Sequence, residues 1–337
     1  VTAIDRYDGA PAQQVAHNAL TVDMSDADAL GAAVVSTGAE LVDPGAALPA
    51  GSIPDSNSVL LAGLVVEHGA ALASVTRSAD TAASLAGALT AAAAGADLIV
   101  TSGGVSAGAF DPLTMLAEDR AALDQDGAAG AAIRLRFARV AMQPGKPQGH
   151  GTVRADDGRE VPLIMLPGNP VSVLVSFRTI VAPALARLMG HDGVGGTGGA
   201  SGSGGGPGAG PLPRAGTRPP VRARAAEAWK TAGERRQYIP VRFVPAPTGA
   251  AAPGAATAET VPRPSDGAVG PAYWVAPTHR LGSGSHLVAS LPAAQALAVV
   301  AAGTPAVGVG DEVRLIALSH PAGPGGGELP PPPAAAH

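Results

Sequence analysis

Cysteine is absent from the 337-residue sequence, and aromatic residues make up only 3% of it. The missing cysteines exclude a disulfide framework, a thiolate metal site and a cysteine nucleophile. Charged residues are also scarce, at 15% against roughly 25% in typical soluble domains. The net charge of −5 gives no global positive field. We therefore expect no nucleic-acid partner, and an anionic ligand must be held by local groups.

The sequence also lacks the pattern of a signal peptide. The first 18 residues lack the basic start and apolar core of a signal peptide. The longest uncharged stretch, residues 282–310, is interrupted by Pro292, Gly303 and Pro305, so it does not predict a membrane span. A hydrophobic content of 46% nevertheless argues against a wholly disordered chain. We expect a globular, cytoplasmic protein that does not enter a membrane.

Strand-like and helix-like segments alternate between residues 32 and 190. Buried strands are predicted at residues 32–35, 71–75, 97–100, 135–142 and 161–166. Helices are predicted after the capping run 55–58, over 81–94, near 111–112 and over 170–189. This order predicts a three-layer α/β domain with a mostly parallel sheet. Ligand sites in such sheets lie at the carboxyl ends of the strands, where the glycine-rich loops of this sequence fall.

The remaining chain divides by composition. Residues 1–31 form a polar and poorly defined N-terminal remnant, residues 191–220 a Gly/Ser/Pro-rich linker, and residues 320–337 a disordered tail. Between linker and tail, residues 221–319 predict a small all-β domain. Its strand-like runs are 221–224, 238–244, 273–276, 297–300 and 312–318.

Two features suggest anion binding, and each has a plainer reading. Only two of the 22 basic residues are lysines, and Lys146 stands in a rigid Pro-Gly-Lys-Pro turn after a predicted strand. It is either a phosphate or oxyanion ligand or a solvated turn residue. The loop from Ser102 to Ser106 offers backbone N–H groups and hydroxyls that suit phosphate, or it is simply a turn.

Carboxylates near these loops also have two readings. Asp80 and Asp111 precede predicted helices, which is the place of an N-cap, but they could also hold a Mg²⁺ beside phosphate oxygens. Glu40 follows a Ser-Thr-Gly turn and could be a surface residue. The eight histidines lack ligand spacing, so no zinc site is expected.

Five loop motifs follow one another along the chain: STGAEL (36–41), DSN (55–57), DLIVTSGGVSAGAFD (97–111), VAMQPGKP (140–147) and LPGNPVS (166–172). Together they resemble the molybdopterin molybdenumtransferases of molybdenum-cofactor biosynthesis, the bacterial MoeA proteins and the gephyrin E domain. The resemblance is strong over residues 32–190 and weaker over 218–318. It implies a MogA/MoaB-like α/β domain followed by a small C-terminal β-barrel.

The resemblance also implies an enzyme. With Mg²⁺ it would cleave adenylated molybdopterin, release AMP and leave molybdenum from molybdate on the pterin dithiolene. It implies catalytic roles for Glu40, Asp80, Asp111 and Lys146, with Asp80 and Asp111 as the metal ligands. The substrate-binding positions that it implies are Ser102, Gly103, Gly104, Ser106, Arg139, Pro167, Asn169, Pro170, Arg236 and Ser285.

The sequence departs from the family in three ways. Ala39 stands where an acidic residue is common, and Gln143 where many members have a lysine. Members also carry two further N-terminal domains that help to form a dimer and close the cleft. Because only the short remnant precedes the match here, we expect either a fragment or a reduced protein.

Two alternatives stay open: a molybdopterin adenylyltransferase of the same fold, and a non-catalytic molybdopterin-binding or scaffold module. A homodimer and an upstream adenylyltransferase as partner are open as well.

Overall fold

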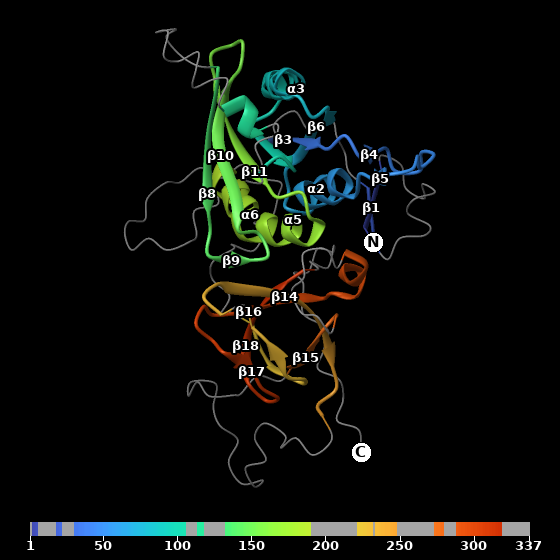
Figure 1. The fold of residues 1–337 in the computed structure, drawn as a ribbon, viewed down its shortest axis with the longest axis vertical. Coiled ribbons are helices and arrows are strands. Elements are labelled where there is room, and N and C mark those ends of the chain that lie inside the picture. Colours follow the sequence, from blue (N-terminus) through green and yellow to red (C-terminus); the bar gives the residue numbers. More distant parts are fainter. Residues whose placement is uncertain are drawn as a thin grey trace, which may run out of the picture. The chain divides into compact units, whose positions relative to one another are not determined.

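The computed structural model describes residues 2–5, 18–21, 30–105, 113–117, 132–189, 221–231, 233–247, 273–279 and 288–318 (Figure 1). The chain forms two compact units. Unit 1 contains most of the chain before residue 190. Unit 2 contains the C-terminal strands together with two earlier segments, residues 139–146 and 169–175.

A six-stranded sheet forms the centre of unit 1, in the order β6-β3-β7-β11-β10-β8. The strands β6, β3, β7 and β11 run parallel, whereas β10 runs antiparallel to β11. The predicted mostly parallel sheet is therefore confirmed. The strand bounds are β3 (Gly31–Thr37), β6 (Ala71–Ser78), β7 (Leu98–Ser102), β8 (Ile133–Arg139), β10 (Pro147–Arg154) and β11 (Glu160–Leu166).

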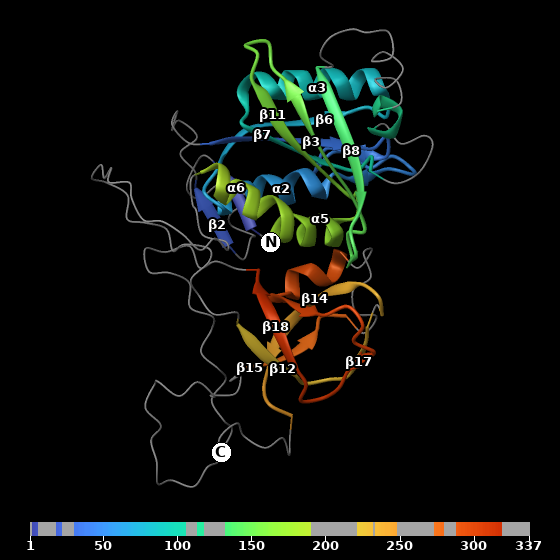
Figure 2. The ribbon, with the colours of Figure 1, turned by 90° about the vertical axis from the view of Figure 1, so that its left-hand side faces the viewer.

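Helices cover both faces of this sheet, which confirms the three-layer prediction (Figure 2). Helix α3 (Ala82–Gly95) places Leu85 and Leu89 in an apolar core with residues of β3, β7 and β11. Helices α2 (Ser56–Glu67) and α6 (Ala182–Leu188) lie on the other face. Both α2 and α3 begin at side-chain caps: Asp55 accepts the Ser58 N–H, and Thr81 accepts the Ser84 N–H.

The helical segment after β11 is not uniform. It consists of α5 (Pro170–Ser176), the π-helical turn η1 (Phe177–Val181) and α6, where the sequence predicts one continuous helix. Residues Pro170–Leu188 are long and apolar enough to cross a membrane, with a mean hydropathy of 1.6, but 56% of the most apolar window is buried in the protein. A mostly buried apolar helix is the pattern of a core helix.

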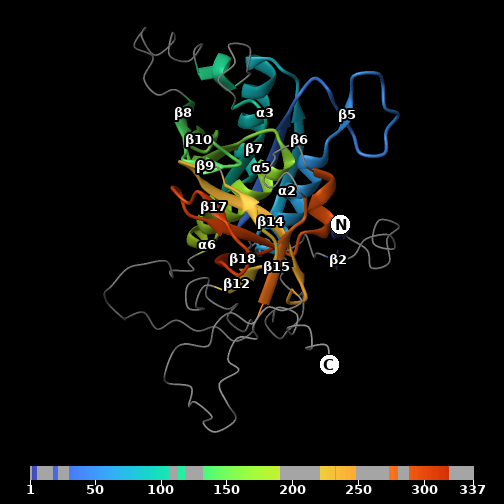
Figure 3. The same ribbon diagram turned by 60° about the horizontal axis from the view of Figure 1, so that its bottom comes forward.

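Five strands of unit 2 close into a barrel, in the order β15-β12-β18-β16-β14, because β14 also pairs with β15 (Figure 3). The predicted C-terminal barrel is confirmed. Strand β9 (Met142–Gln143) extends this sheet by pairing in parallel with β14. The bounds are β12 (Arg222–Ala225), β14 (Arg236–Val244), β15 (Tyr273–Pro277), β16 (Ala296–Val300) and β18 (Glu312–Ala317).

Shorter elements complete the described residues. Strands β1 (Thr2–Asp5) and β2 (Asn18–Thr21) pair in parallel, as do β4 (Leu41–Val42) and β5 (Ile53–Pro54). In unit 2, β13 (Trp229–Lys230) pairs with β17 (Ala306–Val307), and η2 (Val288–Ala293) is a 3-10 helix.

Among the six strands of the central sheet of unit 1, β10 is the one that the sequence does not predict, and the short strands β1, β2, β4, β5, β13 and β17 are not predicted either. Strand β10 contains Gly149 and Gly151, which weaken strand propensity. The structure explains Gly151, since a Cβ at this position would overlap the Arg134 carbonyl oxygen of β8. The strand predicted over residues 135–142 is also divided, because β8 ends at Arg139 and residues 142–143 join the barrel sheet.

Candidate functional site

The carboxyl ends of the four parallel strands reach the same level in unit 1. The register pairs Thr37 of β3 with Ser78 of β6, and it pairs Ser102 of β7 with both Ser36 of β3 and Leu166 of β11. The loops after these strands therefore leave the sheet along one edge. In open parallel sheets this edge is where ligands bind.

Buried hydroxyl groups line the ends of these strands. Ser36, Thr37, Ser78, Thr101 and Ser102 are each at most 7% exposed. The Thr37 Oγ1 donates to the Ser102 carbonyl oxygen at 3.5 Å. The side-chain oxygens of Thr101 and Ser102 are buried and have no hydrogen-bond partner in the part of the chain that the structure describes. Buried polar atoms are normally paired, so this edge keeps unused hydrogen-bonding capacity.

The start of α2 is fastened to this edge by two side chains. Asp55, which is 3% exposed, accepts a hydrogen bond from Ser36 Oγ at 2.5 Å and another from the Ser58 N–H at 3.0 Å. The Asn57 Nδ2 donates to the Gly168 carbonyl oxygen at 2.6 Å. The sequence predicts residues 55–58 as a helix cap, which Asp55 confirms, but it assigns neither Asp55 nor Asn57 to the site.

Two of the predicted catalytic carboxylates lie at one turn. Asp80 Oδ2 accepts the Ala39 N–H at 2.7 Å, in a turn closed by the bond from the Leu41 N–H to the Gly38 carbonyl oxygen. The Glu40 side chain lies over the same turn, since a Cβ at Gly38 would be 2.9 Å from Glu40 Oε2. Both carboxylates are exposed, and neither forms an ion pair with a residue that the structure describes.

This turn is chemically suited to Mg²⁺. The ion takes few protein carboxylates and completes its octahedral shell with water and phosphate oxygens. Asp80 has a second carboxylate oxygen beyond the one bonded to Ala39, and Glu40 lies at the same turn. The parts of the chain that the structure describes contain no group of three or more metal-binding side chains. Asp111, Ser106 and Ser285 lie outside the described residues.

The glycine loop after β7 is held in close contact with its neighbours. Gly103 has φ +89°, and a Cβ there would be 2.7 Å from both Thr37 O and Thr37 Oγ1. Its N–H donates to the Leu166 carbonyl oxygen at 3.1 Å. This amide is therefore already hydrogen-bonded and does not offer the donor to phosphate that the sequence predicts. Gly104 also has positive φ, at 73°, and Pro167 is buried.

The predicted basic residues belong to unit 2. A turn brings their backbones together: the Val140 N–H donates to the Lys146 carbonyl oxygen at 2.8 Å, and the Arg236 N–H donates to the Ala141 carbonyl oxygen at 3.0 Å. The side chains of Lys146, Arg139 and Arg236 are exposed. None of the three has an ion-pair partner among the described residues.

Two further predicted positions of unit 2 lie at the start of α5. The Asn169 carbonyl oxygen accepts the Val173 N–H at 2.9 Å. Asn169 is exposed, whereas Pro170 is half-buried.

Residues 33–187 match the family described as the probable molybdopterin binding domain. This match covers a little under half of the chain, so the likeness to the family concerns that domain. Over 160 residues it is 43% identical to molybdopterin molybdenumtransferase 2 of Mycobacterium tuberculosis (strain H37Rv), which covers 47% of this chain and 36% of the relative. The molybdopterin molybdenumtransferase of Haemophilus influenzae is 35% identical over 157 residues, which cover 47% of this chain and 35% of the relative. The matched region thus spans about a third of the length of these curated relatives.

Solved structures support the same fold. A molybdopterin biosynthesis MoeA protein from Pyrococcus horikoshii has a TM-score of 0.54 and 24% identity, covering 85% of this chain and 54% of that chain. A second structure of MoeA from this organism has a TM-score of 0.52 and 16% identity, covering 85% and 53%. This likeness extends beyond the molybdopterin-binding-family domain and includes the barrel architecture.

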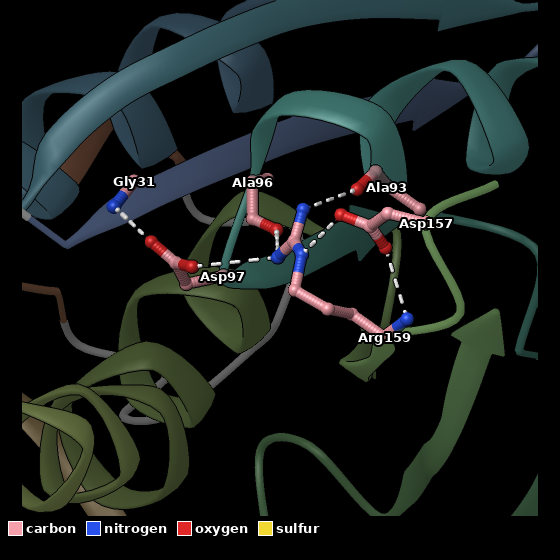
Figure 4. A network of polar contacts seen from close by, with 6 residues as sticks. All are labelled: Gly31, Ala93, Ala96, Asp97, Asp157 and Arg159. Carbon is pink, nitrogen blue, oxygen red and sulfur yellow. Dashed lines mark hydrogen bonds and ion pairs between the residues drawn. The ribbon is translucent and has the colours of Figure 1, made fainter. Parts of the chain in front are cut away.

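A polar network lies at the opposite edge of the same domain, where β3 and β7 begin (Figure 4). Arg159 contacts Asp157 at 2.7 Å and Asp97 at 3.6 Å, and Asp97 accepts the Gly31 N–H at 2.9 Å. The Arg159 guanidinium also donates to the carbonyl oxygens of Ala93 and Ala96 at the end of α3. Its side-chain hydrogen bond holds the pKa of Asp157 below the ordinary value of 3.8.

This network is structural. It joins the β10–β11 turn to the end of α3 and to the amino ends of the strands, which is the edge that parallel sheets do not use for ligands. Sequence reasoning missed it, because Asp97 and Arg159 are far apart in the chain and no local pattern relates them.

Proposed function

We propose that this chain acts in molybdenum-cofactor biosynthesis as a molybdopterin molybdenumtransferase. It would bind adenylated molybdopterin and molybdate, cleave the adenylate with release of AMP, and leave molybdenum on the dithiolene. The observation that supports this proposal is the edge at which Glu40 and Asp80, which form no ion pair with a described residue, adjoin the Gly103 loop through Thr37. The match to the probable molybdopterin binding domain runs over residues 33–187 and therefore includes this edge.

The proposed role of each of these residues follows from its charge. Asp80, together with Asp111, would hold a Mg²⁺, which when bound offsets the negative charge of the substrate phosphates. Glu40 would orient the same groups from the neighbouring position of the turn. Lys146 would bind an anionic group of the substrate or molybdate. The remaining proposed binding positions are Arg139, Arg236, Ser102, Gly103, Gly104, Ser106, Pro167, Asn169, Pro170 and Ser285.

The adenylated substrate has to be supplied by an adenylyl-transfer reaction, so an upstream adenylyltransferase is the proposed partner, in the cytoplasm. A homodimer is part of the same proposal, supported by the family likeness. A non-catalytic molybdopterin-binding module is the second candidate, because the chain matches only about a third of its curated relatives. Against an adenylyltransferase stands the closed C-terminal barrel, which the MoeA structures share.

Molybdate-dependent AMP release tests the proposal. The chain would be incubated with adenylated molybdopterin, Mg²⁺ and molybdate and compared with the variant Asp80→Asn. The amide oxygen can still accept the Ala39 N–H, so this variant removes the charge and keeps the turn. We expect at least a hundredfold slower release, on the order of a lost electrostatic contribution to the transition state.

The matched control is Asp43→Asn. Asp43 is an exposed carboxylate of the next loop that pairs with Arg77 at 2.9 Å. Release should be unchanged in this control. Binding of adenylated molybdopterin without any AMP release by the wild-type chain would instead establish the non-catalytic module.

A further inference from the structure

Asn57 completes a closed circuit of contacts around the ligand edge of unit 1. From the end of β3, Ser36 bonds Asp55 at the start of α2. From α2, the Asn57 side chain bonds the Gly168 carbonyl oxygen after β11. Gly168 lies against Gly103, since a Cβ on Gly168 would be 3.5 Å from the Gly103 Cα.

The circuit returns to β3 at Thr37. A Cβ on Gly103 would be 2.7 Å from the Thr37 carbonyl oxygen, so the two backbones are in close contact. Three of the loops that carry proposed binding positions are therefore stacked in the order Thr37, Gly103, Gly168. The bond from Asn57 to Gly168 holds the outer loop of this stack, and it can be removed without touching the Asp55 cap of α2.

Stability alone does not explain an asparagine at this place. Asn57 is 8% exposed, and its Oδ1 is buried and has no hydrogen-bond partner among the described residues. A buried acceptor that has lost its water is unfavourable. A leucine of similar size would avoid this penalty and would still fill the space. What leucine cannot supply is the directed bond to the Gly168 carbonyl oxygen.

We infer that Asn57 is a positioning residue, which sets the place of the Pro167–Gly168 loop against the Gly103 loop and thereby the spacing of the substrate-binding edge. The identity of the ligand in this inference rests on the proposed function, whereas the positioning of the two loops by Asn57 rests on the contacts alone.

Substitutions at Asn57 separate positioning from packing. In Asn57→Leu the volume is kept and the bond is lost. The Gly103 N–H, which bonds Leu166 between the two loops, should then exchange with solvent about five- to tenfold faster, as expected for one net hydrogen bond. In Asn57→Asp the ionised carboxylate would face the Gly168 carbonyl oxygen and could not donate to it, whereas the protonated acid could.

Exchange in Asn57→Asp should therefore depend on pH. Burial raises the pKa of a carboxyl group above the ordinary value of about 3.9, and below that raised pKa the acid form predominates. Protection of the Gly103 N–H, corrected for intrinsic exchange, should return as the pH falls. In the wild type and in Asn57→Leu it should not change across the same range. A purely packing role predicts no such recovery.

The experiment combines exchange of the Gly103 amide, followed by NMR, with binding of adenylated molybdopterin. Ser56→Ala is the matched control, because Ser56 is exposed in the same first turn of α2. We expect Asn57→Leu to bind about tenfold more weakly and the control to behave as wild type. Equal Gly103 protection in wild type and Asn57→Leu overturns the inference. If the wild type does not bind adenylated molybdopterin, the proposed function is wrong, while the exchange result still decides the role of Asn57.

Discussion

Gly103→Ala should destabilise unit 1 far more than the same substitution at Gly158. Both glycines have nearly the same backbone angle, with φ of 89° and 88°. The substitution at either position carries the conformational penalty of a side chain at positive φ, roughly 1–2 kcal/mol. At Gly158, in the β10–β11 turn, a Cβ meets nothing within 4 Å. At Gly103 it would be 2.7 Å from two oxygens of Thr37, and forcing atoms into a packed site costs about 1–3 kcal/mol more.

Urea unfolding of the two variants measures this difference. We expect the free energy of unfolding to fall by about 1–2 kcal/mol in Gly158→Ala and by about 2–5 kcal/mol in Gly103→Ala. Because both glycines belong to unit 1, the same transition reports both values. Equal losses in the two variants would refute the close contact between Thr37 and Gly103. That result would also remove the stacking of loops from which the role of Asn57 is argued.

Two further predictions concern ion pairs. The pKa of Asp157 is lowered in the folded state, mainly by its hydrogen bond from Arg159. The ionised Asp157 therefore stabilises the fold above the ordinary pKa of 3.8, and this contribution is lost as the pH falls through the lower pKa of the folded state. The difference in urea midpoint between wild type and Asp157→Asn should therefore shrink in acid, and a difference independent of pH would contradict it. The Arg178 side chain is 4% exposed, and its guanidinium bonds the Glu67 carboxylate at 2.9 Å. Glu67→Gln removes the negative charge of this buried pair, so it should lower the free energy of unfolding by about 3–5 kcal/mol. Adding Arg178→Met should restore part of this loss, and a double variant no more stable than the single one would contradict the assignment.

The strands that sequence reasoning found share a simple physical signal. Buried parallel strands are short apolar runs, and residues 32–35 and 97–100 show this pattern between polar turns. All five barrel strands begin within two residues of their predicted positions. Four of them contain β-branched residues, which favour strands, whereas β12 consists of Arg and Ala alone. Strand β10 gives no such signal. Gly151 is required by the approach of β8, and a Cβ at Gly149 would meet Met165 of β11, so both constraints become visible only when the strands are placed side by side.

The candidate site also contains features that the sequence predicts and features that it does not. Loops after parallel strands must share an edge, so the grouping of Glu40, Asp80 and Gly103 could be predicted from the order of the elements. The circuit through Asp55 and Asn57 could not. It depends on where the start of α2 meets residues 19 and 111 positions away in sequence, and local patterning carries no information about such distances.

The small strand β9 has a consequence for how this protein can be divided. Met142 and Val175 come from the segments that belong to unit 2, and both lie in one apolar cluster with Tyr238 and Leu297 of the barrel strands. A cut at the glycine-rich linker would take the barrel away and leave these two side chains without their cluster. The barrel therefore cannot be gained or lost as an intact unit by recombination at one position in the gene. Any rearranged gene that keeps both halves working must carry the two short inserts along with the barrel that they complete.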